Sequence, residues 1–199
     1  MKIALLILAA GESKRMQSIK QLLPWKNTTL LGNAIEQAIQ SKGNAVYVVL
    51  GAQANQIAPT IAHYQVQIIE NTNWQNGLGN SIAAGVNYIK QNQPDYDAIL
   101  ITLADQPLLT ADYYNRLIDH YVQKEAKIIA SETNNRPSVP ALFDALYFDK
   151  LSQLHQDHGA KEILLAAQND LYVMPADTNL IDVDTQMEYE KVYTNFGKE

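Results

Sequence analysis

Ile3-Ala4-Leu5-Leu6-Ile7-Leu8-Ala9-Ala10 is a continuous apolar run, and it leads into Gly11-Glu12-Ser13-Lys14-Arg15-Met16 and then to Lys20. The run has no polar alternation, and it is too short to span a bilayer. These properties predict a strand that is buried on both faces of a parallel sheet. The polar residues after it would then form a loop at the carboxyl end of that strand.

This loop carries the residue types of a polyphosphate site. Gly11 can adopt backbone angles closed to other residues and lets a ligand approach the main chain, while neighbouring N–H groups can line an anion-binding concavity. Arg15 can fork onto two phosphate oxygens, and Lys20 adds a mobile point charge. The alternative is a plain turn whose two cations are solvated. Neither the P-loop pattern nor the dinucleotide pattern Gly-x-Gly-x-x-Gly occurs here, so neither of those sites is supported.

Composition narrows the class of protein. With 199 residues and 47% hydrophobic content, the chain is expected to form a single domain over residues 1–199. The net charge of −6 and the lack of long basic runs argue against nucleic acid as a partner. The chain has no cysteine, which excludes disulfides and thiolate metal sites. The first apolar run does not resemble a signal peptide, so we expect a cytoplasmic protein without a membrane partner.

The hydrophobic pattern alternates between strands and helices. Strands are predicted at 3–10, 45–50, 66–69, 96–103 and 127–130, and helices at about 30–40, 54–62, 81–90 and 112–124. This order predicts an α/β fold with three layers, α/β/α, and a Rossmann-like mixed, mostly parallel sheet joined by right-handed crossovers. Further along, we expect a loop at 131–139 that covers the substrate. The elements predicted after it are a short strand at 140–143, a helix near 161–167, closing strands at 170–174 and 180–183, and a last helix at 186–193.

The segment from Asn71 to Ser81 is rich in amides and small residues and follows a predicted strand. Loops after parallel strands are where ligands bind in open α/β sheets. Gly77 would let the main chain press against a base, while Asn80 and Ser81 can read its edge. The alternative is a glycine-softened connection with a helix cap at Asn80 or Ser81.

Carboxylates mark a candidate metal site. Asp105 follows the strand at 96–103, where it would face the Gly11 loop, and a carboxylate beside bound phosphates suits Mg²⁺. The alternative is that Asp105 opens a turn before Pro107. Asp184 has a similar alternative, which is to cap the last helix. His155 and His158 flank Asp157, but solvated histidines are favoured there because no third ligand has zinc spacing.

The pattern Leu8-Ala9-Ala10-Gly11-x-Ser13-x-Arg15-Met16-x-x-x-Lys20-Gln21-Leu22-Leu23 resembles the opening signature of the nucleotidyltransferases that act on the molybdenum cofactor. Asp105-Gln106-Pro107 and Asp182-Val183-Asp184-Thr185 resemble two later motifs of the same family. The resemblance implies a nucleotide-diphospho-sugar transferase-like fold and Mg²⁺ as cofactor. It implies metal ligation by Asp105 together with Asp184 or Asp182. The chain departs from the family at Gln17, Val139, Gln156 and Lys161.

The resemblance also implies a reaction, in which CMP from CTP is transferred onto the terminal phosphate of molybdopterin and pyrophosphate leaves. Arg15, Lys20 and Asp105 would be catalytic, and Arg136 and Lys161 would bind the acceptor. Transient contact with a molybdoenzyme or its chaperone is implied as well. The implied nucleotide-binding residues are Leu8, Ala9, Ala10, Gly11, Arg15, Lys20, Asn71, Gly77, Asn80 and Ser81.

Alternative functions differ in nucleotide, acceptor or chemistry. The methyl group of Ala10 narrows the space beside the base, which favours CTP over GTP, and a GTP-dependent guanylyltransferase is the alternative. A related transferase could instead act on a sugar or polyol phosphate. A dehydrogenase is opposed by the missing dinucleotide glycines. A catalytically silent nucleotide-binding protein is disfavoured by the complete set of Arg15, Lys20, Asp105 and Asp184.

Overall fold

The computed structural model describes residues 1–16, 18–123, 126–155, 157, 159–167, 169–175 and 180–198. Gln17, Gln156 and His158, named above, lie outside the described residues. The main sheet has seven strands in the order β5-β4-β1-β6-β8-β7-β9. In sheet order they are β5 (Gln67–Glu70), β4 (Ala45–Leu50), β1 (Ile3–Ala9), β6 (Ala98–Leu103), β8 (Arg136–Asp144), β7 (Ile128–Thr133) and β9 (Leu171–Met174).

The predicted parallel sheet is confirmed. β1 lies at its centre and pairs in parallel with β4 and β6, and every residue of β1 is buried. β5 continues the parallel set beyond β4. Among the described strands, β8 is the one that runs antiparallel to both of its neighbours, β6 and β7. The sheet is therefore mixed and mostly parallel.

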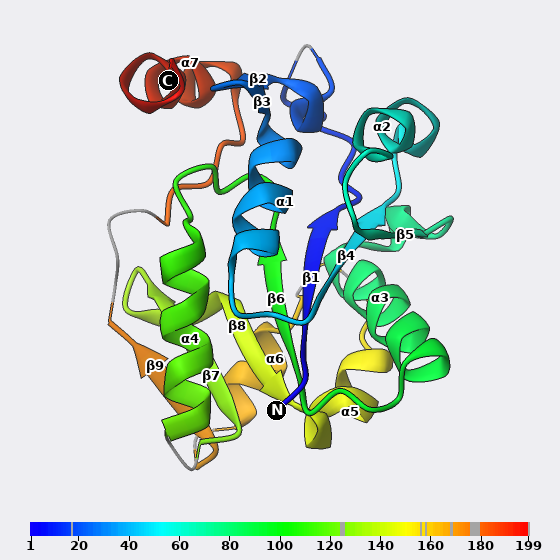
Figure 1. Ribbon diagram of the computed structural model, residues 1–199, viewed down its shortest axis with the longest axis vertical. Coiled ribbons are helices and arrows are strands. Elements are labelled where there is room, and N and C mark those ends of the chain that lie inside the picture. Colours follow the sequence, from blue (N-terminus) through cyan, green and yellow to red (C-terminus); the bar gives the residue numbers. More distant parts are fainter. Residues whose placement is uncertain are drawn as a thin grey trace.

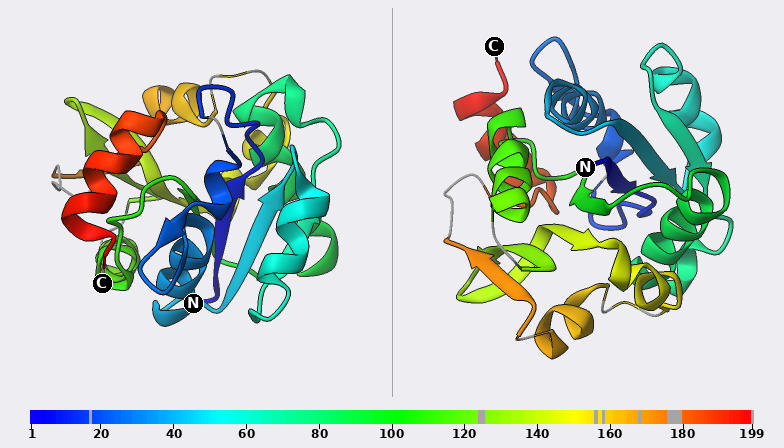
Figure 2. Two further views of the ribbon diagram at one scale, coloured as in Figure 1. Left: turned by 90° about the horizontal axis from the view of Figure 1, so that it is seen from above. Right: turned by 60° about the horizontal axis from the view of Figure 1, so that its bottom comes forward.

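Helices cover both faces of the sheet, as the three-layer prediction requires. Leu5 and Ile7 pack on the side of α1 and α4, whereas Leu6 and Leu8 pack on the side of α3, α5 and α6. Figures 1 and 2 show these two layers from three directions. The helices are α1 (Leu30–Gln40), α2 (Ala54–Ile61), α3 (Leu78–Asn92), α4 (Ala111–Gln123), α5 (Phe148–Ser152), α6 (Lys161–Ala166) and α7 (Gln186–Phe196).

A small third core joins the two ends of the chain. The hairpin of β2 (Pro24–Trp25) and β3 (Thr28–Thr29) lies beside α7 at the top of Figure 1. Trp25, Tyr189 and Val192 are buried together there, and the Tyr189 hydroxyl donates to the carbonyl oxygen of Pro24 at 2.7 Å. This contact holds the segment before α7, which contains Asp184, against the part of the chain that follows the first loop.

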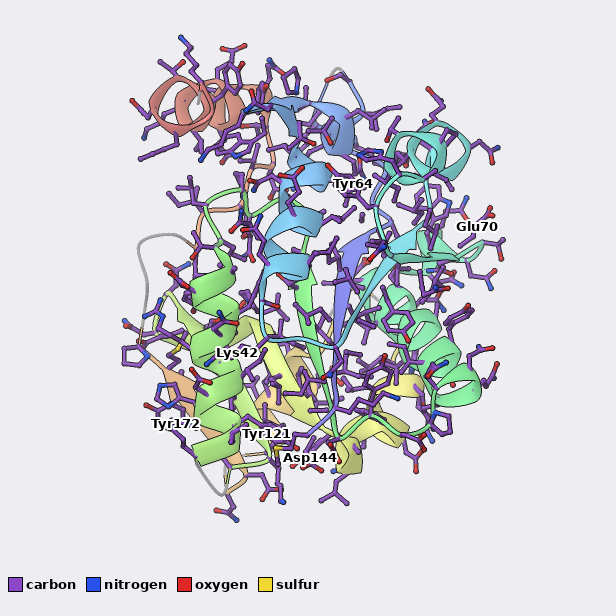
Figure 3. All side chains as sticks on the ribbon, in the orientation of Figure 1. Lys42, Tyr64, Glu70, Tyr121, Asp144 and Tyr172 are labelled. Atoms are coloured by element: carbon purple, nitrogen blue, oxygen red, sulfur yellow. The ribbon has the colours of Figure 1, made fainter. Side chains whose placement is uncertain are left out.

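The two edges of the sheet differ. At the amino-terminal edge, Tyr121 donates to Asp144 at 2.7 Å, and both residues are labelled near the bottom of Figure 3. The carboxyl ends of β1 and β6 point to the opposite edge, where ligand sites of open α/β sheets lie. Within the described part of the chain, none of the helices combines the length and hydropathy that crossing a bilayer requires.

The structure corrects several predicted elements. Residues 131–139 do not form a covering loop, because β7 and β8 extend through them as a hairpin whose turn residues, Asn134 and Asn135, have positive φ. Residues 180–183 do not form a strand. Instead, the N–H of Val183 donates to the carbonyl of Asp105 at 2.9 Å.

Helix starts also differ from the prediction. α3 begins at Leu78 with Gly77 as its N-cap, so the predicted caps Asn80 and Ser81 lie inside its first turn. Thr185, rather than Asp184, caps α7 through a reciprocal capping box with Glu188.

Candidate active site

A cavity of about 700 Å³ opens at the carboxyl ends of β1 and β6. It collects most of the residues that the sequence singled out, from the first loop, the start of α3, the end of β6 and the segment before α7. The predicted residues in its lining are Leu8, Ala9, Ala10, Gly11, Arg15, Lys20, Gly77, Ser81, Asp105 and Asp184.

Three successive carbonyl groups at the start of the first loop are hydrogen-bonded within the protein. The side-chain amide of Gln21 donates to the carbonyl oxygens of Ala9 at 2.9 Å and Gly11 at 3.0 Å. The carbonyl of Ala10 accepts from the N–H of Ala52 at 3.0 Å. Because these oxygens already have partners, they present less negative charge to an anionic ligand in the cavity.

Gly11 contributes to this loop because it lacks a side chain, and its φ is not positive. A Cβ atom built at Gly11 would meet nothing within 4 Å, so the missing side chain leaves open space along the cavity wall. Among the described residues of the loop, Ser13 has a positive φ, at 59°. Its hydroxyl accepts from the N–H of Lys20 at 3.3 Å, which links the turn to the lysine.

Two cations and two carboxylates meet in the cavity. The ammonium of Lys20 lies 2.7 Å from Asp105 Oδ2 and 3.2 Å from Asp184 Oδ1, and Arg15 lies 3.2 Å from Asp184 Oδ2. Burial alone would lower the pKa of Lys20, but the charges and hydrogen bonds of Asp105 and then Asp184 outweigh it and raise that pKa. Lys20 is therefore a fixed positive charge at neutral pH.

The carboxylates fit a hard divalent cation that brings further ligands with it. Asp105 Oδ1 is buried and finds no hydrogen-bond partner among the described residues, so this carboxylate keeps an unused oxygen. The same residues contain no group of three or more His, Asp or Glu side chains that could hold a metal. Phosphate oxygens and water would have to complete the coordination of an ion held by Asp105 and Asp184, which is the usual arrangement for Mg²⁺.

Asp182, the other late carboxylate, lies beside this site without lining the cavity. It accepts a hydrogen bond from Gln106 at 2.8 Å. Burial, followed by the negative charge of Asp105, raises the pKa of Asp182. Of the two late carboxylates, Asp184 is the one that contacts Lys20 and faces the cavity.

The amide-rich segment contributes in part. Asn71 is buried and donates to the Ser81 hydroxyl at 3.1 Å, so it positions Ser81 instead of lining the cavity itself. Asn80 does not line the cavity either. Trp74 does, and it packs closely on Gly51, where an added Cβ would lie 2.5 Å from the Cβ of Trp74.

A second cavity of about 460 Å³ adjoins the first and contains both predicted acceptor residues, Arg136 and Lys161. The two cavities share Leu8, Leu78 and Leu103. The β7–β8 hairpin supplies one wall, and the start of α6 supplies another. A ligand in the second cavity would therefore lie directly beside one in the first.

Sequence reasoning missed the roles of Gln21 and Leu103. Gln21 belongs to the motif that resembles the family's opening signature, but nothing in that motif indicates its hydrogen bonds to the loop carbonyls. Leu103 is the last residue of β6, where alternation along the strand could have placed it on the ligand side. His155 is exposed, and its ring nitrogen Nδ1 lies 3.1 Å from the carbonyl oxygen of Gln153.

A triphosphate-sized cavity, fixed cations and paired carboxylates at the carboxyl edge of a mostly parallel sheet define an α/β domain of the nucleotidyltransferase class. Comparison with known families agrees. Residues 5–173 match the MobA-like NTP transferase domain, and the chain belongs to that family.

Relatives of known name differ in function. The purine catabolism protein PucB of Bacillus subtilis (strain 168) is 29% identical over 198 residues, covering 93% of each chain. The molybdenum cofactor cytidylyltransferase of Escherichia coli (strain K12) is 30% identical over 113 residues, 56% of this chain and 56% of that protein. Nicotine blue oxidoreductase of Paenarthrobacter nicotinovorans is 33% identical over 115 residues, 56% of this chain and 53% of that protein. The last two are thus matched over about half their length.

Solved structures share the fold along the whole chain. A homologue of Rv0371c from Mycobacterium sp. strain JC1 has a TM-score of 0.83 at 26% identity, covering 98% of this chain and 96% of that one. Rv0371c of Mycobacterium tuberculosis H37Rv in complex with manganese has a TM-score of 0.80 at 24% identity, covering 96% and 98%. The second of these supports the fold alone.

Proposed function

We propose that this protein transfers CMP from CTP onto the terminal phosphate of molybdopterin, with Mg²⁺ as cofactor, and releases pyrophosphate. The observation that carries the proposal is the meeting of Lys20, Asp105 and Asp184 in the cavity beside the Gly11 loop. The partial match to the E. coli molybdenum cofactor cytidylyltransferase supports the choice of reaction.

The proposed chemistry is an in-line attack on the α-phosphorus. A phosphate oxygen of the acceptor forms a new bond to that phosphorus, the bond to the β-phosphate bridge breaks, and its electron pair leaves with pyrophosphate. The acceptor phosphate is already ionised near neutral pH, so positioning and charge neutralisation supply the rate. No side chain of the protein needs to become covalently attached.

Each charged residue has a distinct task in this proposal. Lys20 and Arg15 would neutralise the negative charge of the triphosphate, including the charge that develops on the leaving pyrophosphate. Asp105 and Asp184 would hold the divalent ion, which would supply further charge neutralisation.

The nucleotide and the acceptor are assigned to the two adjoining cavities. Backbone groups of Ala9, Ala10 and Gly11 would hold the base and ribose in the first cavity. Ala10 lines this cavity, and its methyl group would narrow the space beside the base, which would favour a pyrimidine and therefore CTP over GTP. Arg136 and Lys161 place two cations in the second cavity, where the acceptor phosphate needs them.

The test incubates the protein with molybdopterin, Mg²⁺ and each nucleoside triphosphate in turn, and identifies the products by mass. We expect molybdopterin cytosine dinucleotide and pyrophosphate with CTP, and a much slower reaction with GTP. Asp105→Asn should abolish transfer while the protein stays folded. Faster reaction with GTP would overturn the assignment of the nucleotide, and transfer to a sugar phosphate in place of molybdopterin would overturn that of the acceptor.

A further inference from the structure

Lys20 occupies the position between the two carboxylates that the proposed metal ion would share. Its ammonium contacts Asp105 at 2.7 Å and Asp184 at 3.2 Å, and its side chain is 15% exposed. The residue is delivered by the short 3-10 helix η1 (Lys20–Leu22), next to Gln21, whose amide is fixed to the loop carbonyls. The contact is therefore part of a well-anchored local structure.

The same two carboxylates cannot fully serve a lysine and a divalent cation at once. Both cations draw on the oxygens that face the centre of the site, and they repel one another at close range. Asp105 nevertheless retains one buried oxygen with no partner among the described residues. The ammonium of Lys20 therefore leaves part of the hydrogen-bonding capacity of the two carboxylates unused.

We propose that Lys20 holds the cation position in the nucleotide-free protein, and that a divalent ion takes this position only when a triphosphate draws the ammonium away. The proposal rests on the proposed function, because it concerns the same carboxylate pair. Two consequences follow from it. Asp105 and Asp184 stay close together without mutual repulsion before substrate arrives, and the protein alone binds divalent ions poorly.

A triphosphate has the charge needed to move the lysine. It carries several negative charges, whereas the ammonium now shares one charge on Asp105 and one on Asp184, the second of which Arg15 already neutralises in part. Lys20 lines the cavity in which the triphosphate would bind, so a side-chain rotation can transfer it from carboxylate to phosphate. Removing Lys20 should have the opposite effect on the free protein, in which Asp105 would lose its cation and Asp184 would keep only its exposed pair with Arg15.

The test measures Mn²⁺ binding to metal-free protein without nucleotide, by electron paramagnetic resonance of the free ion. We compare the wild type with Lys20→Met and with a control, Lys42→Met. Lys42 pairs with Asp119 at 2.7 Å on the surface and is labelled beside α1 and α4 in Figure 3, so its loss changes the net charge equally, far from the cavity. We expect Lys20→Met to bind Mn²⁺ at least about tenfold more tightly than the wild type and than Lys42→Met. Equal or weaker binding by Lys20→Met would overturn the proposal.

A measurement on the unaltered protein applies even if Lys20→Met does not fold. The ammonium resonance of Lys20 can be followed by nitrogen NMR in protein labelled at lysine. We expect millimolar Mg²⁺ alone to leave this signal in place and a non-hydrolysable CTP analogue to shift it. A shift caused by Mg²⁺ alone would refute the proposal. Neither readout requires turnover or an acceptor, so a failed transferase assay would count against the proposed function and leave this inference standing.

Discussion

Replacing Gln21 with methionine should loosen the first loop and thereby weaken nucleotide binding. Methionine keeps the length of the side chain but removes the amide that donates to the carbonyls of Ala9 and Gly11. Gln21 is 5% exposed, and the bond to Ala9 is buried, so water cannot replace the lost donor there. Leaving one buried carbonyl unpaired, and exposing the second to water, should cost about 2 kcal/mol of unfolding free energy.

Urea denaturation at 25 °C measures the loss of stability, and steady-state kinetics measures its effect on the site. We expect the KM for the nucleotide to rise more than kcat falls, because the N–H groups of the loop lose their fixed direction while Asp105 is untouched. Gln56→Met is the matched control, since Gln56 is exposed and its side chain bonds the neighbouring Gln53. If Gln21→Met unfolded at the wild-type urea concentration and kept the wild-type KM, the assigned role of the amide would be wrong.

Three further predictions concern charge and burial. Arg15→Gln should change the free energy of unfolding by less than about 0.5 kcal/mol, because the ion pair with Asp184 is exposed. The same variant should raise the KM for the triphosphate. A large loss of stability would contradict the assignment of Arg15 to the ligand. Hydrogen bonds from the Asp184 N–H and from Thr185 lower the pKa of Glu188. Glu188→Gln should therefore reduce the melting temperature at neutral pH. The difference in melting temperature between the two proteins should vanish as the pH falls below 4.5 and through that lowered pKa. Burial raises the pKa of Tyr114 to about 12. The wild type should therefore lose stability as the pH rises from 10 toward 12, and Tyr114→Phe should lose less over that range. At neutral pH the variant should be less stable than the wild type by about 1 kcal/mol, because the Thr102 hydroxyl loses its hydrogen-bond partner. Denaturation curves across pH check both titrations.

The parts of the site that sequence could predict are those placed by strand ends. β1 is recognisable because it is apolar throughout, and its end fixes where Gly11 must lie. Asp105 follows β6 in the same way, and adjacent parallel strands bring their carboxyl ends together. The resemblance predicted Asp184 or Asp182 beside Asp105 in one metal site, but not the contact of Asp184 with Lys20, since no local pattern joins residues so far apart in the chain.

The wrong or missing predictions concern residues whose structure is set by their hydrogen-bond partners and differs from what the local sequence pattern indicates. Residues 131–139 are polar, which is typical of a loop, yet they form a hairpin because the ends of β7 and β8 pair with each other, Ser131 with Ser138 and Thr133 with Arg136. Residues 180–183 look apolar enough for a strand, but the N–H of Val183 pairs with a single carbonyl at Asp105. Gln21 could not be predicted either, because its partners are main-chain atoms that carry no sequence identity.

The reversed direction of β8 has a consequence for how the acceptor could change over evolution. In a parallel sheet, each strand end at the ligand edge is tied to a crossover helix, so altering one connection disturbs the packing of a whole layer. Here one wall of the second cavity ends in the turn at Asn134 and Asn135, which joins β7 directly to β8 and not to a helix. Insertions in that turn would reshape the second cavity while the first keeps its geometry, so under the proposed function the acceptor and nucleotide specificities would be separately adjustable by mutation or grafting.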